Sequence, residues 1–237
     1  MLNEALAPGK LATGRRIYAV GDIHGCIEQL TALHALIAED LATRPVAAAT
    51  LLHIGDYVDR GPDSRAVLDH LAGPAPVPGV EVVNLLGNHE VMMLEAMDFE
   101  AHPGAVPFWL QNGGVPTLRS YGVMSAVPGW WQSIPQAHLD FLGQCSLTYQ
   151  AGGYLFVHAG IRPELPLEEQ DSADLLWIRE PFLSWAGDLG TVVVHGHTPG
   201  KAPVIWPNRI GIDTGACFGG QLTCLVLEGD RMRFLAV

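Results

Sequence analysis

The chain has 237 residues, of which 49% are hydrophobic and 16% are charged, so it can bury a large core and is not an intrinsically disordered protein. Its 25 acidic residues outnumber its 13 basic residues, and the resulting net charge of −12 argues against sequence-independent binding to nucleic acid. No apolar run is long enough to cross a membrane, and the four cysteines form no C-x-x-C pair, so we expect reduced thiols and a cytoplasmic protein.

The first half of the chain alternates between strand-like and helix-like segments. Short apolar runs predict three strands, at residues 17–20, 50–54 and 80–86. Apolar residues at helical spacing predict a helix after each strand, at residues 27–41, 64–71 and 91–97. Asp63 stands where it can cap the second helix. This alternation favours a largely parallel sheet.

The second half of the chain has a different pattern. Periodicity is weak from about residue 99 to 145, which predicts an irregular helical insertion whose Trp109, Trp130 and Trp131 are more typical of a core than of a substrate surface. Further strands are expected at residues 154–157, 191–194, 209–212, 222–227 and 232–237, with a hairpin turn at 228–230. We expect a single α/β catalytic domain over residues 1–237, with a mixed or antiparallel sheet from the second half.

Five polar strings follow predicted strands. They are GDIHG at 21–25, GDYVDRG at 55–61, GNHE at 87–90, HAG at 158–160 and HGHT at 195–198. Strands of an open α/β sheet deliver functional groups at their carboxyl ends, so the strings can build one site. Asp22 and His24 are two residues apart and can face one ion, and the two oxygens of Asp56 can bridge two cations. Carboxylate, amide and imidazole ligands without thiolate suit Mn, Fe, Zn or Mg-like ions, and paired cations suit phosphoester hydrolysis.

In this order, the five strings resemble the phosphoprotein phosphatase family of metallophosphoesterases. The resemblance runs from residue 21 to residue 198, most of the chain. It implies a four-layer αββα sandwich and the hydrolysis of phosphomonoesters by a water that bridges two divalent cations. Mn²⁺ is the expected metal, with Fe or Zn as alternatives. The implied substrates are phosphoserine and phosphothreonine in proteins, with phosphotyrosine or small phosphoesters in addition, and neither nucleic acid nor a membrane is an expected partner.

The resemblance also implies a role for individual residues. The implied metal ligands are Asp22, His24, Asp56, Asn88, His158 and His197. His197 is preferred to His195 because the family ligand follows Gly and precedes Thr or Gln; His195 and Asp213 are left without a fixed role. The implied general acid is His89, and Asp59 would hold its imidazole and favour the protonated form.

The implied phosphate ligands are Arg60, Asn88 and Arg179, the last of these in a Trp-x-Arg string typical of bacterial and phage members. Glu90 is expected to support the loop rather than to transfer a proton.

Two other functions remain open. Symmetrical dinucleoside tetraphosphate hydrolases have Ala and Asp where this chain has Asp59 and Glu90, which favours the phosphatase. A phosphopeptide-binding pseudo-enzyme would be expected to lack Asp56, Asn88 or His89.

Histidines outside the strings are expected to be surface residues or hydrogen-bonded core residues: His34, His53, His70, His102 and His138. The physiological substrate, the native metal and the oligomeric state stay open.

Overall fold

The computed structural model describes residues 4–98 and 100–237; residues 1–3 and Phe99, where the expected insertion begins, lie outside the described residues. Six strands form a first sheet in the order β1-β11-β10-β2-β3-β4. Their bounds in that order are Ala5–Leu6, Arg231–Ala236, Thr223–Glu228, Arg15–Val20, Ala48–His53 and Glu81–Asn84. Strands β2, β3 and β4 run parallel, which confirms the parallel sheet predicted from the first half of the chain.

Five strands form a second sheet in the order β5-β6-β7-β9-β8. Their bounds in that order are Thr148–Ala151, Tyr154–Val157, Val192–His195, Arg209–Gly211 and Val204–Ile205. Strands β6, β7 and β9 run parallel and the two edge strands are antiparallel, so this sheet is mixed, as predicted.

The prediction that the last two strands belong to this second sheet is wrong. Strands β10 and β11 return to the first sheet, where β10 pairs antiparallel with β2. Apolar alternation identifies a strand but not its partner, so the sequence could not show this return. The hairpin turn between the two strands is confirmed, because Glu228 pairs with Arg231 across it.

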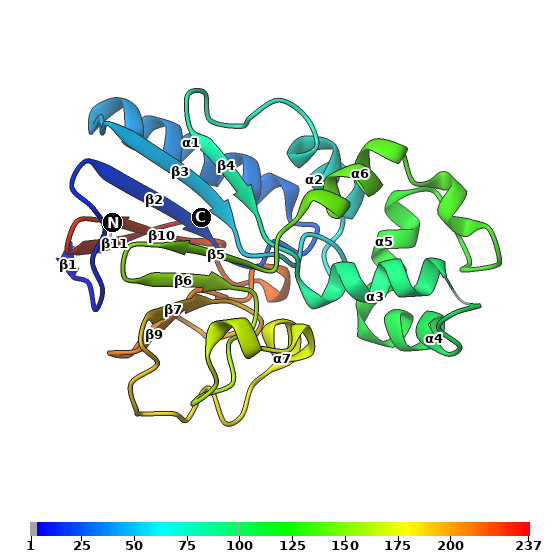
Figure 1. Ribbon diagram of the computed structural model, residues 1–237. Coiled ribbons are helices and arrows are strands. Elements are labelled where there is room, and N and C mark those ends of the chain that lie inside the picture. The colour runs from blue at the N-terminus through cyan, green and yellow to red at the C-terminus, as the bar shows by residue number, and fades with distance from the viewer. Residues whose placement is uncertain (1–3, 99) are drawn as a thin grey trace.

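The two sheets pack face to face, with helices outside them (Figure 1). Side chains such as Ile17 of the first sheet and Phe156 of the second form the core between them. Helices α1 (Ile27–Thr43) and α2 (Ser64–Leu71) cover the outer face of the first sheet, and α7 (Ser172–Trp177) covers the second. Asp63 caps α2 as expected, because its side chain accepts a hydrogen bond from the N–H of Ala66. This is the four-layer αββα sandwich.

The segment of the chain between β4 and β5 is helical, as predicted. It contains α3 (Asn88–Met97), α4 (Ala105–Trp109), a π-helical turn (Leu110–Gly114), α5 (Val115–Ser120), a 3₁₀ turn (Trp130–Ser133) and α6 (Gln136–Gln144). These helices gather at one end of the sheets (Figure 1). Trp109 and Trp130 are buried and stack with ring centroids 4.8 Å apart, which confirms them as core residues. No helix of the described residues is long and apolar enough to cross a membrane.

Three histidines form a hydrogen-bonded chain between α1, α2 and β3. His34 lies 2.9 Å from His70 through Nδ1 and 2.9 Å from His53 through Nε2. Nδ1 of His53 in turn lies 2.7 Å from Oδ1 of Asn84. The expectation for the histidines outside the strings is confirmed, because His102 is exposed and the other four have hydrogen-bond partners.

We expect the free energy of unfolding to fall as the pH drops from 6.5 toward 4. Burial lowers the pKa of His53 from 6.5 to about 4, and burial with the charges of its neighbours lowers that of His34 to about 2. The unfolded chain then binds protons that the folded chain does not, at a cost of up to about 1.4 kcal/mol per pH unit per histidine. Urea unfolding between pH 7.5 and 4.5 measures this loss. The slope should be shallower in His53→Leu, and identical slopes in both proteins would contradict the explanation.

Candidate active site

The polar strings meet at one edge of the sandwich. Strands β2, β3 and β4 of the first sheet end at this edge, and so do β6 and β7 of the second. Contacts between strings join the two sheets there. The backbone N–H of His197, after β7, donates to Oδ2 of Asp22, after β2, at 3.0 Å. Nδ1 of His158, after β6, lies 3.0 Å from the carbonyl oxygen of Ile54, after β3.

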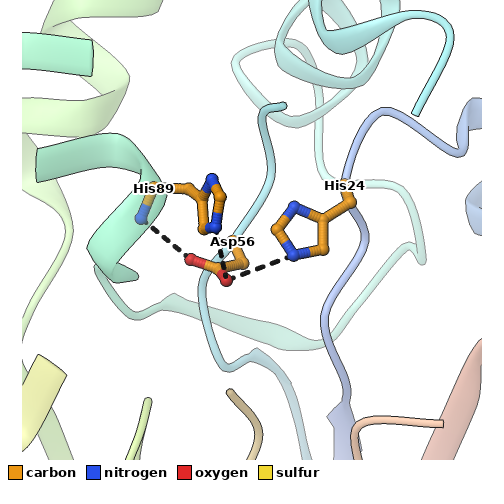
Figure 2. A group of neighbouring side chains, drawn as sticks. All are labelled: His24, Asp56 and His89. Carbon is orange, nitrogen blue, oxygen red and sulfur yellow. Dashed lines mark hydrogen bonds and ion pairs between the residues drawn. The ribbon is translucent and has the colours of Figure 1, made fainter. Parts of the chain in front are cut away.

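The carboxylate of Asp56 lies at the centre of the site and is 1% exposed. Its Oδ2 is 3.2 Å from Nε2 of His24 and 4.0 Å from Nε2 of His89. Figure 2 draws both of these interactions as dashed lines. Its Oδ1 is 3.4 Å from Nε2 of His158 and accepts a hydrogen bond from the backbone N–H of His89. The two oxygens therefore face two different groups of imidazoles. Each oxygen could therefore contact a cation together with the imidazoles on its side.

The protonation of His158 tests whether the site suits a cation. Nδ1 of His158 lies 3.0 Å from a carbonyl oxygen and must donate to it, and burial lowers the pKa of His158, so Nε2 carries a lone pair. This lone pair faces Oδ1 of Asn88 at 2.8 Å and Oδ1 of Asp56 at 3.4 Å. Three acceptors aimed at one another repel unless a cation lies among them. The donor set therefore fits a metal ion.

Asn88 and His197 complete this second group. Nδ1 of His197 lies 2.9 Å from Oδ1 of Asn88. Atoms of Asp56, His158 and His197 lie within 4.8 Å of one another and could hold one ion. His195 does not join them, because its ring packs on Phe182 at 5.0 Å between centroids. The structure thus brings His197, and not His195, to the ligand group.

The first group contains His24, Asp56 and His89, whose donor atoms also lie within 4.8 Å of one another. Nδ1 of His24 lies 2.7 Å from the carbonyl oxygen of Val58, which leaves its Nε2 for the site. Asp22, the other expected ligand, enters the site from the side of Gly196. A Cβ atom on that glycine would lie 2.0 Å from Oδ1 of Asp22, so only glycine leaves room for the carboxylate.

Negative charge accumulates in this buried site. Burial and the charges of Asp213 and Asp56 raise the pKa of Asp22 well above its usual value. Burial opposes the ionisation of Asp56 as well, yet His158, His89 and His24 hold its pKa well below the usual range. Asp213, whose role the sequence left open, accepts a hydrogen bond from the N–H of Gly215 and adds a further carboxylate beside the site. Bound cations would offset this charge.

The imidazole of His89 is held from behind by Asp59. Nδ1 of His89 lies 2.8 Å from Oδ2 of Asp59, and Nε2 is buried without a hydrogen-bond partner among the described residues. Asp59 also accepts hydrogen bonds from Nε1 of Trp109, at 3.0 and 2.9 Å, and from Oγ1 of Thr117, at 2.6 Å. The helical insertion therefore does more than cover one side of the site, because two of its side chains fix the carboxylate that orients His89.

We expect Trp109→Phe to lower the turnover number by about tenfold and the stability by about 2 kcal/mol. The variant keeps an aromatic ring on Trp130 but removes a buried hydrogen bond to a carboxylate, a bond worth roughly 1.5–3 kcal/mol. Steady-state kinetics and urea unfolding measure the two effects. The buried Trp130, whose Nε1 has no partner among the described residues, offers Trp130→Phe as a control. An equal loss of turnover in both variants would contradict a specific role for the Trp109 N–H.

The two arginines lie at different depths. Arg60 is half-buried, and its Nη1 donates to Nε2 of His24 at 2.8 Å. Arg179 is exposed at the rim. Its charge contributes, after burial and His158, to lowering the pKa of His197 to about 3. Arg60 thus reaches the centre of the site, whereas Arg179 lies beside the His197 end.

Glu90 ties together the two loops that carry Asp56 and Asn88. Its carboxylate accepts hydrogen bonds from four backbone N–H groups, those of Asp56, Tyr57, Val58 and Gly87. This agrees with the supporting role expected from the sequence. A glutamate reaches these donors from the first turn of α3, so its carboxylate is committed to the backbone and not to the reaction.

The backbone at the site is strained, which the sequence could not reveal. Five site residues adopt the left-handed region with φ between 44° and 71°: His24, Asp56, Asp59, Arg60 and His197. Residues other than glycine seldom do so, at a cost on the order of 1–3 kcal/mol each. Such strain is concentrated at functional sites because the surrounding structure has to impose it.

Sequence reasoning also missed functional residues outside the strings. Trp109 and Thr117, which hold Asp59, lie in a segment of weak periodicity, and nothing in their spacing points to a carboxylate 50 and 58 residues away. Phe108 and Phe218 are exposed near the site. Phe218 lies between Gly215 and the pair Gly219-Gly220, and a large apolar residue within a glycine-rich loop is the one signal that could have identified it.

Comparison with known proteins agrees with this geometry. A family model described as calcineurin-like phosphoesterase matches residues 15–223. The chain is 30% identical over 218 residues to serine/threonine-protein phosphatase 1 of Salmonella typhimurium, which covers 88% of this chain and 90% of the relative. It is 28% identical over 235 residues to the asymmetrical bis(5'-nucleosyl)-tetraphosphatase PrpE of Anoxybacillus flavithermus, which covers 87% of this chain and 88% of the relative.

A solved structure named as a candidate diadenosine tetraphosphatase shares the fold. It superposes with a TM-score of 0.65 at 24% sequence identity and covers 97% of both chains. At this identity the likeness concerns the fold alone. The chain is thus similar to proteins named as a serine/threonine-protein phosphatase and to proteins named as tetraphosphatases.

Proposed function

The chain belongs to the calcineurin-like phosphoesterase family, and we propose that it is a metal-dependent phosphoprotein phosphatase. Its substrates are phosphomonoesters in proteins, on serine and threonine and also on tyrosine, together with small phosphoesters. Neither nucleic acid nor a membrane is among the proposed partners. The four cysteines are free thiols, which supports a place in the reducing cytoplasm.

The position of Asp56 carries this proposal. Each of its carboxylate oxygens faces a different imidazole, Nε2 of His24 at 3.2 Å and Nε2 of His158 at 3.4 Å. This arrangement supports two divalent cations that share Asp56. The proposed ligands are Asp22, His24, Asp56, Asn88, His158 and His197. Two such cations, Mn²⁺ before Fe or Zn, would supply an activated water and neutralise the charge of the phosphate.

The remaining residues orient the substrate and move a proton. Arg60 binds the phosphate oxygens with its planar guanidinium, with Arg179 at the rim and the amide of Asn88 as further ligands. His89 donates the proton of its Nε2 to the oxygen of the departing alcohol or phenol. Asp59, at 2.8 Å from Nδ1, keeps that imidazole in the orientation that donation requires. Burial of the site excludes bulk water from these interactions.

A substrate panel on protein of defined metal content tests the proposal. The protein is stripped with a chelator, reloaded with Mn²⁺, Fe²⁺ or Zn²⁺, and assayed for phosphate release from phosphoserine, phosphothreonine and phosphotyrosine peptides and for nucleotide products from a dinucleoside tetraphosphate. We expect metal-dependent release from the peptides at a kcat/KM at least tenfold above that for the nucleotide. Release that does not depend on metal, or a clear preference for the nucleotide, would overturn it.

A dinucleoside tetraphosphate hydrolase is the second candidate. Relatives named as tetraphosphatases support it, and the Anoxybacillus relative is named for the asymmetrical cleavage. Asp59 favours the phosphatase instead, because symmetrical tetraphosphatases have Ala at this position. The products distinguish symmetrical from asymmetrical cleavage, since only the asymmetrical one yields a nucleoside monophosphate. A phosphopeptide-binding pseudo-enzyme has little support, because Asp56, Asn88 and His89 all lie together in the site.

A further inference from the structure

Three aromatic side chains border the candidate active site. They come from separate elements: Phe108 from α4, Trp177 from the end of α7 and Phe218 from the 3₁₀ turn Ala216–Phe218. The ring centroid of Trp177 lies 6.1 Å from that of His197 and 6.2 Å from that of Phe108. The Phe218 ring lies 5.6 Å from the guanidinium carbon of Arg60. The rings therefore stand on the His197 side and on the Arg60 side of the site.

Phe108 and Phe218 are exposed where other phenylalanines are not. Their exposed fractions are 49% and 66%, whereas the other described phenylalanines are buried: Phe141, Phe156, Phe182 and Phe234. An exposed phenyl ring leaves apolar surface in water that a partner could cover, at about 25 cal/mol per Å². Phe218 stands beside Arg60, which is proposed to bind phosphate, and Phe108 packs on Trp177, whose ring lies beside His197. Their place at the site, more than their exposure alone, indicates contact with the substrate.

We propose, on the basis of the phosphatase function above, that Phe108, Trp177 and Phe218 bind the ring of an aryl phosphomonoester, which in a protein is phosphotyrosine. In such a substrate the ring is attached directly to the phosphate oxygen. A phosphate held by Arg60 therefore places its ring at the site, with Phe218 on the Arg60 side and Trp177, backed by Phe108, on the His197 side. Aromatic rings attract one another at centroid distances of about 4.5–7 Å, so a phenyl group at the site gains free energy from each of these rings that lies within this range.

Other phosphoesters use these rings less well. Phosphoserine and phosphothreonine have no ring to stack. A nucleobase is separated from its phosphate by a ribose and lies further out. The reaction itself is unchanged: the water oxygen forms a bond to phosphorus, the bond from phosphorus to the aryl oxygen breaks, and His89 gives its proton to the leaving phenolate.

Kinetics on two matched peptides test the proposal. The metal-loaded full chain is assayed on a phosphotyrosine peptide and on the same peptide with phosphoserine at that position. We expect Phe218→Ala to lower kcat/KM for phosphotyrosine by about three- to tenfold and the Phe108→Ala, Phe218→Ala double variant by more, mainly through KM. The kcat/KM for the phosphoserine peptide should change less than about twofold. Phe218→Trp, which keeps an aromatic ring, should retain the preference for phosphotyrosine over phosphoserine.

Trp206→Ala provides the matched control. Trp206 is an exposed aromatic residue before β9, and β9 runs parallel to β7, so Trp206 lies at the sheet edge away from the site. This variant should change kcat/KM for neither peptide. Equal losses on both peptides in Phe218→Ala, or a loss confined to a dinucleoside tetraphosphate, would overturn the proposal. Absence of phosphate release from every substrate would instead overturn the phosphatase function.

A binding experiment removes the difference in leaving groups. Phenylphosphonate and methylphosphonate cannot be hydrolysed, and calorimetry on the metal-loaded protein measures their affinities directly. We expect phenylphosphonate to bind about tenfold more tightly, and the two affinities to converge in the double variant. Equal affinities in the wild-type protein would contradict the proposal even if the variants lose activity for structural reasons.

Discussion

Asp56→Asn should abolish the activity, with a fall in kcat/KM of at least about a thousandfold on a phosphopeptide in the presence of Mn²⁺. The carboxylate faces Nε2 of His24 with one oxygen and Nε2 of His158 with the other. An asparagine keeps the shape but offers one oxygen in place of two and no charge. Both metal positions are therefore weakened by a single substitution, which is the reason for the large expected effect.

Metal content distinguishes this explanation from a general disturbance of the fold. Elemental analysis after reloading should find about two ions per wild-type chain and fewer than one in Asp56→Asn. Metal should raise the melting temperature of the wild-type protein more than that of the variant, because a ligand stabilises only the state that binds it. Asp230→Asn, at the exposed hairpin turn, is the matched control and should change none of these values. Wild-type turnover in Asp56→Asn would refute the role given to this residue.

The sequence predicted the parts of this site that depend on strand ends. Asp22, Asp56 and Asn88 each follow a strand, and parallel strands end together, so their convergence could be inferred without coordinates. The αββα layering came from the family resemblance. The return of β10 and β11 to the first sheet could not be inferred, because pairing of distant strands leaves no local signal.

What the sequence could not predict are contacts between distant segments. The hydrogen bonds of Trp109 and Thr117 to Asp59 span 50 and 58 residues, in a region without clear periodicity. The left-handed backbone of Asp56 is equally hidden, because it is imposed by tertiary contacts rather than by local preference. The exposed Phe108 and Phe218 gain significance only when Arg60 and His197 are placed beside them in space.

The second large effect is expected for His89→Asn, and it should depend on the leaving group. His89 Nε2 is buried without a hydrogen-bond partner among the described residues, and Asp59 holds the other nitrogen. If His89 protonates the leaving oxygen, turnover of a phosphoserine peptide should fall by about 10²–10⁴-fold. Turnover of p-nitrophenyl phosphate, whose leaving group needs no proton, should fall far less.

Metal content again separates two explanations, because atoms of His24, Asp56 and His89 lie close enough to hold an ion together. A general acid can be removed without loss of metal, whereas a ligand cannot. We therefore expect His89→Asn to keep about two ions per chain. The control variant His102→Asn, at an exposed position, should keep both the metal content and full turnover. Loss of one ion together with an equal fall on both substrates would make His89 a metal ligand and would leave the proton transfer to another group. Retained metal with a loss that grows as the leaving group becomes more basic would identify His89 as the acid, since only proton donation depends on that basicity.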